Sequence, residues 1–385
     1  MNNLLEWLNW VVDLRQEHKV KHLMKDIIMI VFFAKIANAD EWTQIHYFAV
    51  EKEQFLRKYL ELPNGIPSHD TIQRVFAMVS PEFLKGFQIR WNELLSSNKG
   101  DKLKKIFSLD GKTQRGNKRG SMEPNHIVSA VDENGFCFSQ QLVDDKSNEI
   151  TAIPLVLKDL NIKGHVVTTD AMGCQKDIAA LIVKMKADYV LALKANHGIL
   201  HGDVKLYFDD VGLLKGCAYT RTIEKARSSI EIREYWQTED ILWIDGRKDW
   251  SKLKSIAMTR NTITKGSTTT VETRYFISSL GITNNLGITI AKEGEKVTQS
   301  AELIARAIRS HWMVESYHHH LDVTFKEDTN QTADKDAAYN LNIITKIAHN
   351  VLKLLDVGRK NVSIRAKRFI TCLNPEKYID MLMEI

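Results

Sequence analysis

Apolar residues recur at the spacing of an α-helix along the first 98 residues. They stand three or four positions apart in three segments, 23–31, 55–60 and 83–94. Residues that form turns or cap helices separate these segments. Pro81 fits the first turn of a helix, and Ser68 or Asp70 could cap another. We therefore predict an α-helical N-terminal domain over residues 1–98, and both a helix-turn-helix that binds DNA and a plain bundle stay open.

From residue 103 onward the pattern changes to alternating strands and helices. Three apolar strands come first, with Asn134-Gly135 as a hairpin turn between the second and third. A helix, a strand, a second helix and a fifth strand follow. Because a meander followed by helical crossovers gives this order, we predict an α/β fold with a ribonuclease-H-like sheet whose first part covers 103–199.

Short β-like runs dominate the next hundred residues. Examples are 230–233, 241–244 and 268–271. We predict that 200–297 is an all-β insertion, that the core resumes over 298–355 with a long helix, and that 356–385 is a basic C-terminal tail.

Composition excludes several classes of protein. Of the 385 residues 44% are hydrophobic and 26% charged, with a net charge of +5, which does not fit a disordered chain, a fibre or a polytopic membrane protein. The longest apolar run, 27–39, is too short to span a bilayer, so we expect no membrane partner. The four cysteines form no C-x-x-C pair, which argues against zinc ribbons and suits a reducing cytoplasmic location.

Positive charge is concentrated in two stretches. Residues 101–120 hold seven Lys or Arg against two Asp or Glu, and residues 353–377 hold the same numbers. Two solvated faces would explain this pattern, and so would a surface that binds a polyanion.

Two aspartates stand at the ends of apolar strands. Asp110 ends the strand 105–110, and Asp170 follows the strand 165–169. In the predicted sheet these strands are parallel neighbours, so the two carboxylates would lie close together and repel each other unless a cation lay between them. Such an oxygen site suits Mg²⁺ or Mn²⁺. The alternative that each Asp only caps a helix or turn stays open.

A third acid, Glu315, belongs to the helix after the insertion. His311, His318, His319 and Asp322 share its helix face, because they lie about one or two turns away. This polar helix face could be buried because it forms a functional site, or it could simply be exposed to solvent. No H-E-x-x-H pattern is present and no Cys is near in sequence, which disfavours a zinc site.

Six ordered motifs stand out between residues 109 and 328. They are LDGKT at 109–113, KSNEITAIP at 146–154, TTDAMGCQKDIA at 168–179, DYVLALKAN at 188–196, RSHWMVE at 309–315 and LDVTFKED at 321–328. Together with GIPSHDTI at 65–72 they closely resemble the H-repeat-associated bacterial insertion-sequence transposases, which are DDE enzymes.

The resemblance implies a DNA transposase with Asp110, Asp170 and Glu315 as catalytic metal ligands. It implies phosphoryl transfer with two Mg²⁺ or Mn²⁺ ions, acting on transposon terminal inverted repeats and target DNA, and a homodimer on DNA. If His318 and His319 only line their helix, replacing either with Gln should have a much smaller effect than replacing an acid. From charge and motif position we expect DNA contacts from Lys112, Arg115, Lys194, Asn196, Arg309, Trp312, Arg365, Lys367 and Arg368.

The chain also departs from the family pattern. The segment 224–233 has Arg-Ser-Ser at 227–229 where the family has His-Gly-Arg, and His197 stands in place of a Gln. Two alternatives therefore stay open: a decayed or domesticated DNA-binding protein, and a metal-dependent nuclease of the same fold. An unrelated metabolic enzyme is disfavoured, because the chain has neither a G-x-G-x-x-G motif nor a P-loop.

Overall fold

A mixed nine-stranded sheet forms the middle of the molecule. The computed structural model describes residues 6–97, 105–118, 123–144, 147–225, 228–282 and 301–384. The strand order is β3-β2-β1-β4-β5-β9-β8-β7-β6. The strands are β1 (Ile106–Thr113), β2 (His126–Asp132), β3 (Cys137–Leu142), β4 (Val166–Thr169), β5 (Asp188–Leu193), β6 (Ala218–Lys225), β7 (Ser229–Thr238), β8 (Ser255–Lys265) and β9 (Thr268–Ser278).

The five strands predicted within 103–199 are all present. β1 and β2, and then β2 and β3, pair antiparallel, whereas β4 lies parallel to β1 and β5 parallel to β4. One boundary differs from the prediction, because β1 does not end at Asp110 but continues to Thr113. Its pairing with β4 stops at Leu109, whereas its pairing with β2 continues through the polar residues to Thr113.

The prediction of an all-β segment over 200–297 is wrong for its described part. Helices α9 (Gly198–Asp209) and α10 (Val211–Lys215) precede the strands, and 241–244 forms turns. The helical signal is the buried spacing of Val204, Tyr207 and Phe208 on α9. The four strands β6–β9 form no separate sheet, because β9 pairs antiparallel with β5.

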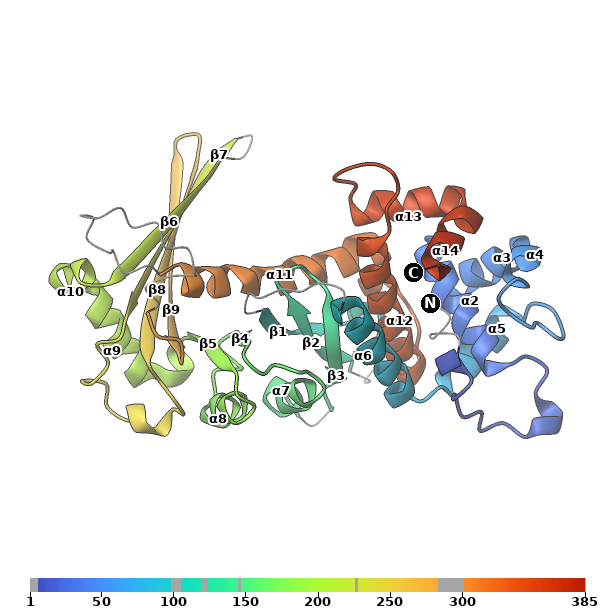
Figure 1. Cartoon of the computed structure of the whole chain (residues 1–385), viewed down its shortest axis with the longest axis horizontal. Coiled ribbons are helices and arrows are strands. Elements are labelled where there is room, and N and C mark those ends of the chain that lie inside the picture. The colour runs from blue at the N-terminus through green and yellow to red at the C-terminus, as the bar shows by residue number, and fades with distance from the viewer. Residues whose placement is uncertain are drawn as a thin grey trace.

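Helices cover both faces of the sheet. Figure 1 shows α7 (Glu149–Lys158) and α8 (Lys176–Lys184) on one side, with α11 (Glu302–Phe325) and α12 (Lys335–Leu354) on the other. One apolar core lies between the strands and α7, α8 and α9. A second joins the strands to the first half of α11, and a third lies around its second half and α12. This arrangement lays α11 along β1.

The N-terminal helices share a core with α12 instead of forming one of their own. They are α2 (Met24–Ile36), α3 (Trp42–Glu51), α4 (Glu53–Leu56), α5 (His69–Ala77) and α6 (Pro81–Ser97). Ser68 caps α5 by accepting the backbone N–H of Thr71, and Pro81 begins α6, as predicted. Among the described helices, none is long and apolar enough to cross a membrane.

The segment expected to be a tail, 356–385, is folded where the structure describes it. It forms α13 (Ile364–Leu373) and α14 (Pro375–Met383), which lie beside the N-terminal helices (Figure 1). Ile379 and Leu382 of α14 are part of the shared core. Arg365, Lys367 and Arg368 are therefore held on the packed helix α13, and Lys377 on α14.

Candidate active site

The two aspartates directly follow the last paired residues of the parallel ladder between β1 and β4. Leu109 of β1 is paired with Thr169 of β4 in the parallel ladder, so the next residues, Asp110 and Asp170, lie side by side. The Asp170 carboxylate accepts the backbone N–H groups of Met172, at 3.0 Å, and of the residue after it. That turn orients Asp170 and begins the connection to α8.

Glu315 reaches the same site from α11. A cavity of about 360 Å³ is lined by Asp110, Asp170 and Glu315 together, although they come from three separate parts of the chain. The structure therefore brings the three acids predicted from sequence to one place. Further lining residues come from β5, β7, β8, β9, α9 and α11, and include Lys194, His201, Arg233, Tyr235, Asn261, Glu272, Arg274, Arg309, His311 and Trp312.

Negative charge is crowded in this cavity. Burial raises the pKa of Asp170, and the neighbouring carboxylates of Glu149 and Asp110 raise it further. Burial also raises the pKa of Glu315; Asp110 adds to that rise, while Arg274 opposes it. A divalent cation would relieve this repulsion.

Two histidines of α11 also face the strand acids. The Nδ1 atom of His318 lies 3.4 Å from Oδ2 of Asp110, so this imidazole faces the acids as well as lining its helix. Nδ1 of His311 lies 3.2 Å from the Thr168 hydroxyl. Burial lowers the pKa of His311 to about 4, despite the nearby Asp110. His311 is therefore uncharged at neutral pH and does not act as a counter-ion for the acids.

The donor atoms suit a hard divalent cation, because three carboxylates converge on one cavity. Within the described residues, no three Asp, Glu, His or Cys side chains lie close enough together to form a ready-made metal site. Mg²⁺ commonly completes its coordination with waters and substrate phosphates, so carboxylates set apart in a cavity remain compatible with it.

Several expected DNA contacts lie at the cavity. Lys194, Arg309 and Trp312 all line it, and the exposed Arg309 lies 3.6 Å from Oε1 of Glu224 on β6. Asn196 has a different contact, because its side-chain amide donates to the Ala171 carbonyl at 2.8 Å. It therefore holds the loop that follows Asp170.

His197, which departs from the family pattern, supports the same loop. Its Nε2 atom donates to the carbonyl oxygen of Cys174 at 2.6 Å. An imidazole can thus replace an amide here as the donor. The other departure, at 227–229, begins outside the described residues, because the structure describes neither 226 nor 227.

Sequence reasoning predicted β structure at 268–271 but did not place the residues of β9 at the acids. Arg274 of β9 lines the cavity, and its guanidinium lies over the Trp312 ring, 5.3 Å from the centroid. Glu272, two residues earlier, accepts from Nε of Arg274 at 2.8 Å. No motif marked these residues, because only the pairing of β9 with β5 brings them to the acids.

Lys112 lies in a cluster of acids at the far end of β1. Its Nζ atom lies 2.7 Å from Asp322, 3.0 Å from Glu327 and 3.0 Å from Asp328, measured to carboxylate oxygens. Burial alone would lower the pKa of Lys112, but the three carboxylates outweigh burial and raise it. Lys112 is therefore a charged partner of these acids. Arg115, close by, is exposed.

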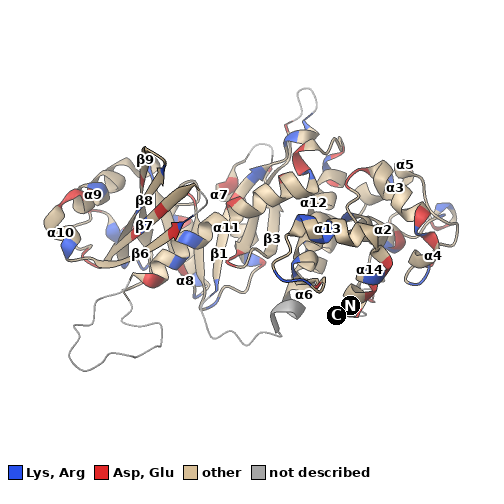
Figure 2. Cartoon of the chain, turned by 90° about the horizontal axis from the view of Figure 1, so that it is seen from above, with Lys and Arg blue, Asp and Glu red and all other residues tan. Residues whose placement is uncertain are grey.

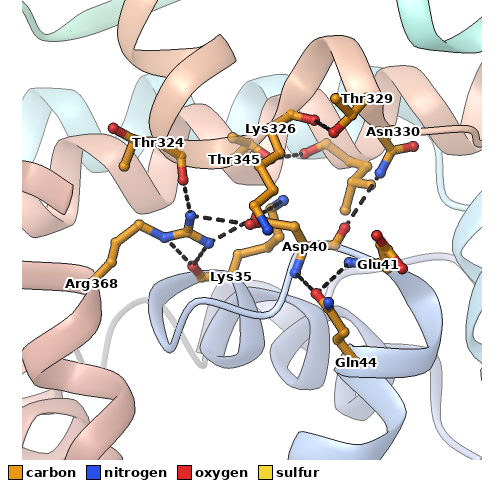
Figure 3. Close-up of polar contacts among 11 residues, drawn as sticks. Lys35, Asp40, Glu41, Gln44, Thr324, Lys326, Thr329, Asn330, Thr345 and Arg368 are labelled. Carbon is orange, nitrogen blue, oxygen red and sulfur yellow. Dashed lines mark hydrogen bonds and ion pairs between the residues drawn. The ribbon is translucent and has the colours of Figure 1, made fainter.

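Arg368 is buried, which is incompatible with the DNA contact expected from sequence. Only 1% of its surface is exposed. Figure 3 shows its guanidinium between Asp40, the Lys35 carbonyl and the Thr324 carbonyl. Its Nη2 and Nη1 atoms donate to the two carboxylate oxygens of Asp40 at 2.8 and 3.2 Å, and Lys35 donates to the same carboxylate at 2.8 Å.

The other two cations expected on this segment differ from Arg368. Arg365 is exposed on α13, while Lys367 donates to the Lys353 carbonyl at 3.0 Å. In the view of Figure 2, Lys and Arg are interspersed with Asp and Glu along the molecule. At least one cation of the stretch 353–377, Arg368, is therefore not available to DNA.

Comparisons with known proteins identify the family of the chain. The family model described as "Transposase DDE domain" matches residues 101–351, and the one described as "DDE_Tnp_1-associated" matches residues 5–92. The chain is 35% identical over 388 residues to "Putative transposase YncI" of Escherichia coli O157:H7. The alignment covers 97% of this chain and 93% of that protein.

Two further relatives extend the comparison. The chain is 35% identical over 368 residues to "H repeat-associated putative transposase YhhI" of Escherichia coli K12, covering 91% of this chain and 90% of that protein. It is 37% identical over 260 residues to "Uncharacterized protein in dhlA 3'region" of Xanthobacter autotrophicus, covering 67% of this chain and 88% of that protein. The resemblance inferred from the motifs is confirmed: the chain belongs to the family of DDE transposases.

Proposed function

We propose that this transposase cleaves the ends of a bacterial insertion sequence and joins the freed 3′-OH to target DNA, with Asp110, Asp170 and Glu315 as its catalytic acids. The observation that carries the proposal is the single cavity lined by all three. Burial, and to a smaller extent the neighbouring carboxylates, raise the pKa values of Asp170 and Glu315, and a divalent cation would stabilise the ionised acids in this setting.

The three carboxylates would hold two Mg²⁺ or Mn²⁺ ions, as the family resemblance implies. Bound divalent ions supply Lewis acidity, which activates an attacking oxygen and stabilises the leaving oxygen in an in-line displacement at phosphorus. The ion identity and the number of ions are part of this proposal.

Cationic side chains of the cavity bind and orient the DNA phosphate. Lys194, Arg274 and Arg309 line the cavity, so their charges attract phosphate oxygens toward the acids. Trp312 holds Arg274 by contact with its guanidinium. The neutral His311 excludes water beside Asp110 without neutralising the acids.

Cleavage of DNA that carries the element's own ends tests the proposal. Purified wild type should nick or cut it with Mg²⁺ or Mn²⁺, and Asp110→Asn and Glu315→Gln should each lose about a thousandfold or more in rate while still binding DNA. His319→Gln is the matched control, because His319 is exposed on α11. Absence of cleavage by wild type with any divalent ion, or full activity of Asp110→Asn, would refute the proposal.

A further inference from the structure

Two contacts hold α11 against β1, one on each side of the catalytic acids. The Ser108 hydroxyl donates to the backbone carbonyl of Ser310 at 2.9 Å. Further along both elements, Nζ of Lys112 lies 2.7 Å from Oδ1 of Asp322. Because the residue numbers rise in the same order on both sides, the helix runs in the same direction as the strand.

Both acids lie between these contacts, Asp110 on the strand and Glu315 on the helix. Asp110 lies near His318, and Lys112 pairs with Asp322. The two strand residues are about 6.7 Å apart along β1, and the two helix residues are about 6 Å apart along α11. Because these two spacings are similar, a single placement of the helix along the strand allows both the Asp110–His318 and the Lys112–Asp322 contacts.

The Lys112 contact is part of a partly buried cluster, in which Asp322 is 33% and Asp328 29% exposed. The side chain of Lys112 is 12% exposed and that of Glu327 only 5%. Glu327 also accepts the side-chain amides of Gln114, at 3.1 Å, and of Asn342. Lys112 thus joins β1 to the end of α11, to the following turn with Glu327 and Asp328, and through Glu327 to α12.

A glycine lets the chain after β1 approach this turn closely. A Cβ atom on Gly116 would lie 2.5 Å from the Asn330 carbonyl oxygen and 2.6 Å from the Asp328 carbonyl oxygen. Such distances are too short for any side chain, so residue 116 packs with its backbone directly on the turn. The chain that follows Lys112 is therefore also packed closely against the turn with Asp328.

We propose that Lys112 is a positioning residue, which through its ion pairs fixes α11 on β1 and so sets Glu315 relative to Asp110. It acts through the acids and does not contact the DNA phosphates. The inference rests on the proposed function in one respect, namely that these acids carry out the chemistry. The anchoring of the helix itself can be measured without that chemistry.

Hydrogen–deuterium exchange on the full chain tests the anchoring. Lys112→Met should speed exchange in peptides covering 106–113 and 302–325 by about tenfold, because the cluster loses its cation. Lys112→Arg keeps the charge and should restore wild-type exchange. Lys52→Met is the matched control, since Lys52 also pairs between elements, with Glu376 at 3.1 Å, but its side chain is 32% exposed against 12% for Lys112. Unchanged exchange in Lys112→Met would overturn the proposal.

Cleavage and metal binding test the consequence for the acids. In Lys112→Met the single-turnover rate at saturating DNA should fall about 10–100-fold, with more Mn²⁺ needed for half-saturation and the Kd for DNA unchanged within about twofold. A weaker Kd with an unchanged rate would instead make Lys112 a phosphate contact. If Lys112→Met does not fold, Asp322→Asn carries the same comparison. Failure of wild type to cleave would refute the proposed function, while the exchange rates would still decide the anchoring.

Discussion

Two clusters of acids lie along the same strand and helix, and they differ in their cations. The first contains Asp110 and Glu315, with Arg274 close to Glu315. The second gathers three carboxylates around the ammonium group of Lys112. Both therefore concentrate negative charge where β1 meets α11.

The first cluster could therefore bind a cation from solution, whereas the second already contains the ammonium group of Lys112. In the first cluster burial and neighbouring carboxylates leave the pKa of Asp170 and of Glu315 raised, so the ionised acids lack sufficient counter-charge. In the second, burial raises the pKa of Asp322 as well, but Lys112 and Lys346 lower the pKa of the more deeply buried Glu327 below its ordinary value. Neutralised acids stabilise the fold, whereas acids short of counter-charge are available for metal and substrate.

Replacing one Asp by Asn in each cluster should give the largest difference in DNA-cleavage rate. Asp170→Asn should reduce metal-dependent DNA cleavage about a thousandfold, because a carboxylate of the proposed metal site becomes an amide. Asp322→Asn should cost only about tenfold, because Lys112 keeps two other carboxylates. Single-turnover cleavage at saturating DNA and Mg²⁺ measures both, and equal losses would mean that the two clusters do not have separate roles.

A stability contrast should follow from Arg368 and Arg365, three residues apart on α13. Arg368→Met leaves the buried Asp40 with Lys35 as its remaining cation, so it should lower the free energy of unfolding by about 3–5 kcal/mol. Arg365→Met alters an exposed side chain and should change it by less than about 0.5 kcal/mol. Urea denaturation followed by fluorescence gives both values. A small effect of Arg368→Met would contradict the inference that its ion pair with Asp40 stabilises the packing of α13 on the N-terminal helices.

Acid should weaken the neutralised cluster. The pKa of Glu327 is lowered in the folded protein from its ordinary value of 4.5, so the unfolded chain binds this proton more tightly. The stability that Glu327 contributes is present above pH 4.5 and is lost as the pH falls through the folded pKa. Glu327→Gln should therefore flatten the fall of the melting temperature below pH 4.5, and an unchanged pH profile would contradict this assignment.

The smallest expected effect is a gain in stability at the catalytic cluster. The raised pKa of Asp170 means that its contribution to stability is present below its ordinary value of 3.8 and is lost as the pH rises through the folded pKa. At pH 8 without divalent ions, Asp170→Asn should raise the melting temperature by about 1–2 °C, because it removes carboxylate repulsion. The gain should shrink when Mg²⁺ is added, since the metal stabilises the wild type. Scanning calorimetry measures both; a loss of stability would mean that the ionised carboxylate supports the fold.

Local patterns were enough to predict much of the fold. Period-two and helical spacing located the strands β1 to β5, the helices between them and the long α11, because hydrophobic periodicity is a property of neighbouring residues. The positions of Asp110, Asp170 and Glu315 followed from strand ends and motifs, and the structure brings all three to one cavity. The sequence by itself thus determined which acids to examine and to which family the chain is similar.

Partnership and burial were decided only by tertiary structure. Lys112 and Arg368 read as exposed cations in sequence, but each is surrounded by groups from distant segments: Asp40 lies 328 residues from Arg368. The approach of Arg274 to Glu315 likewise depends on β9 pairing with β5. A charged residue type does not specify its counter-ion, because the free energy of burying a charge depends on partners that folding brings from elsewhere in the chain.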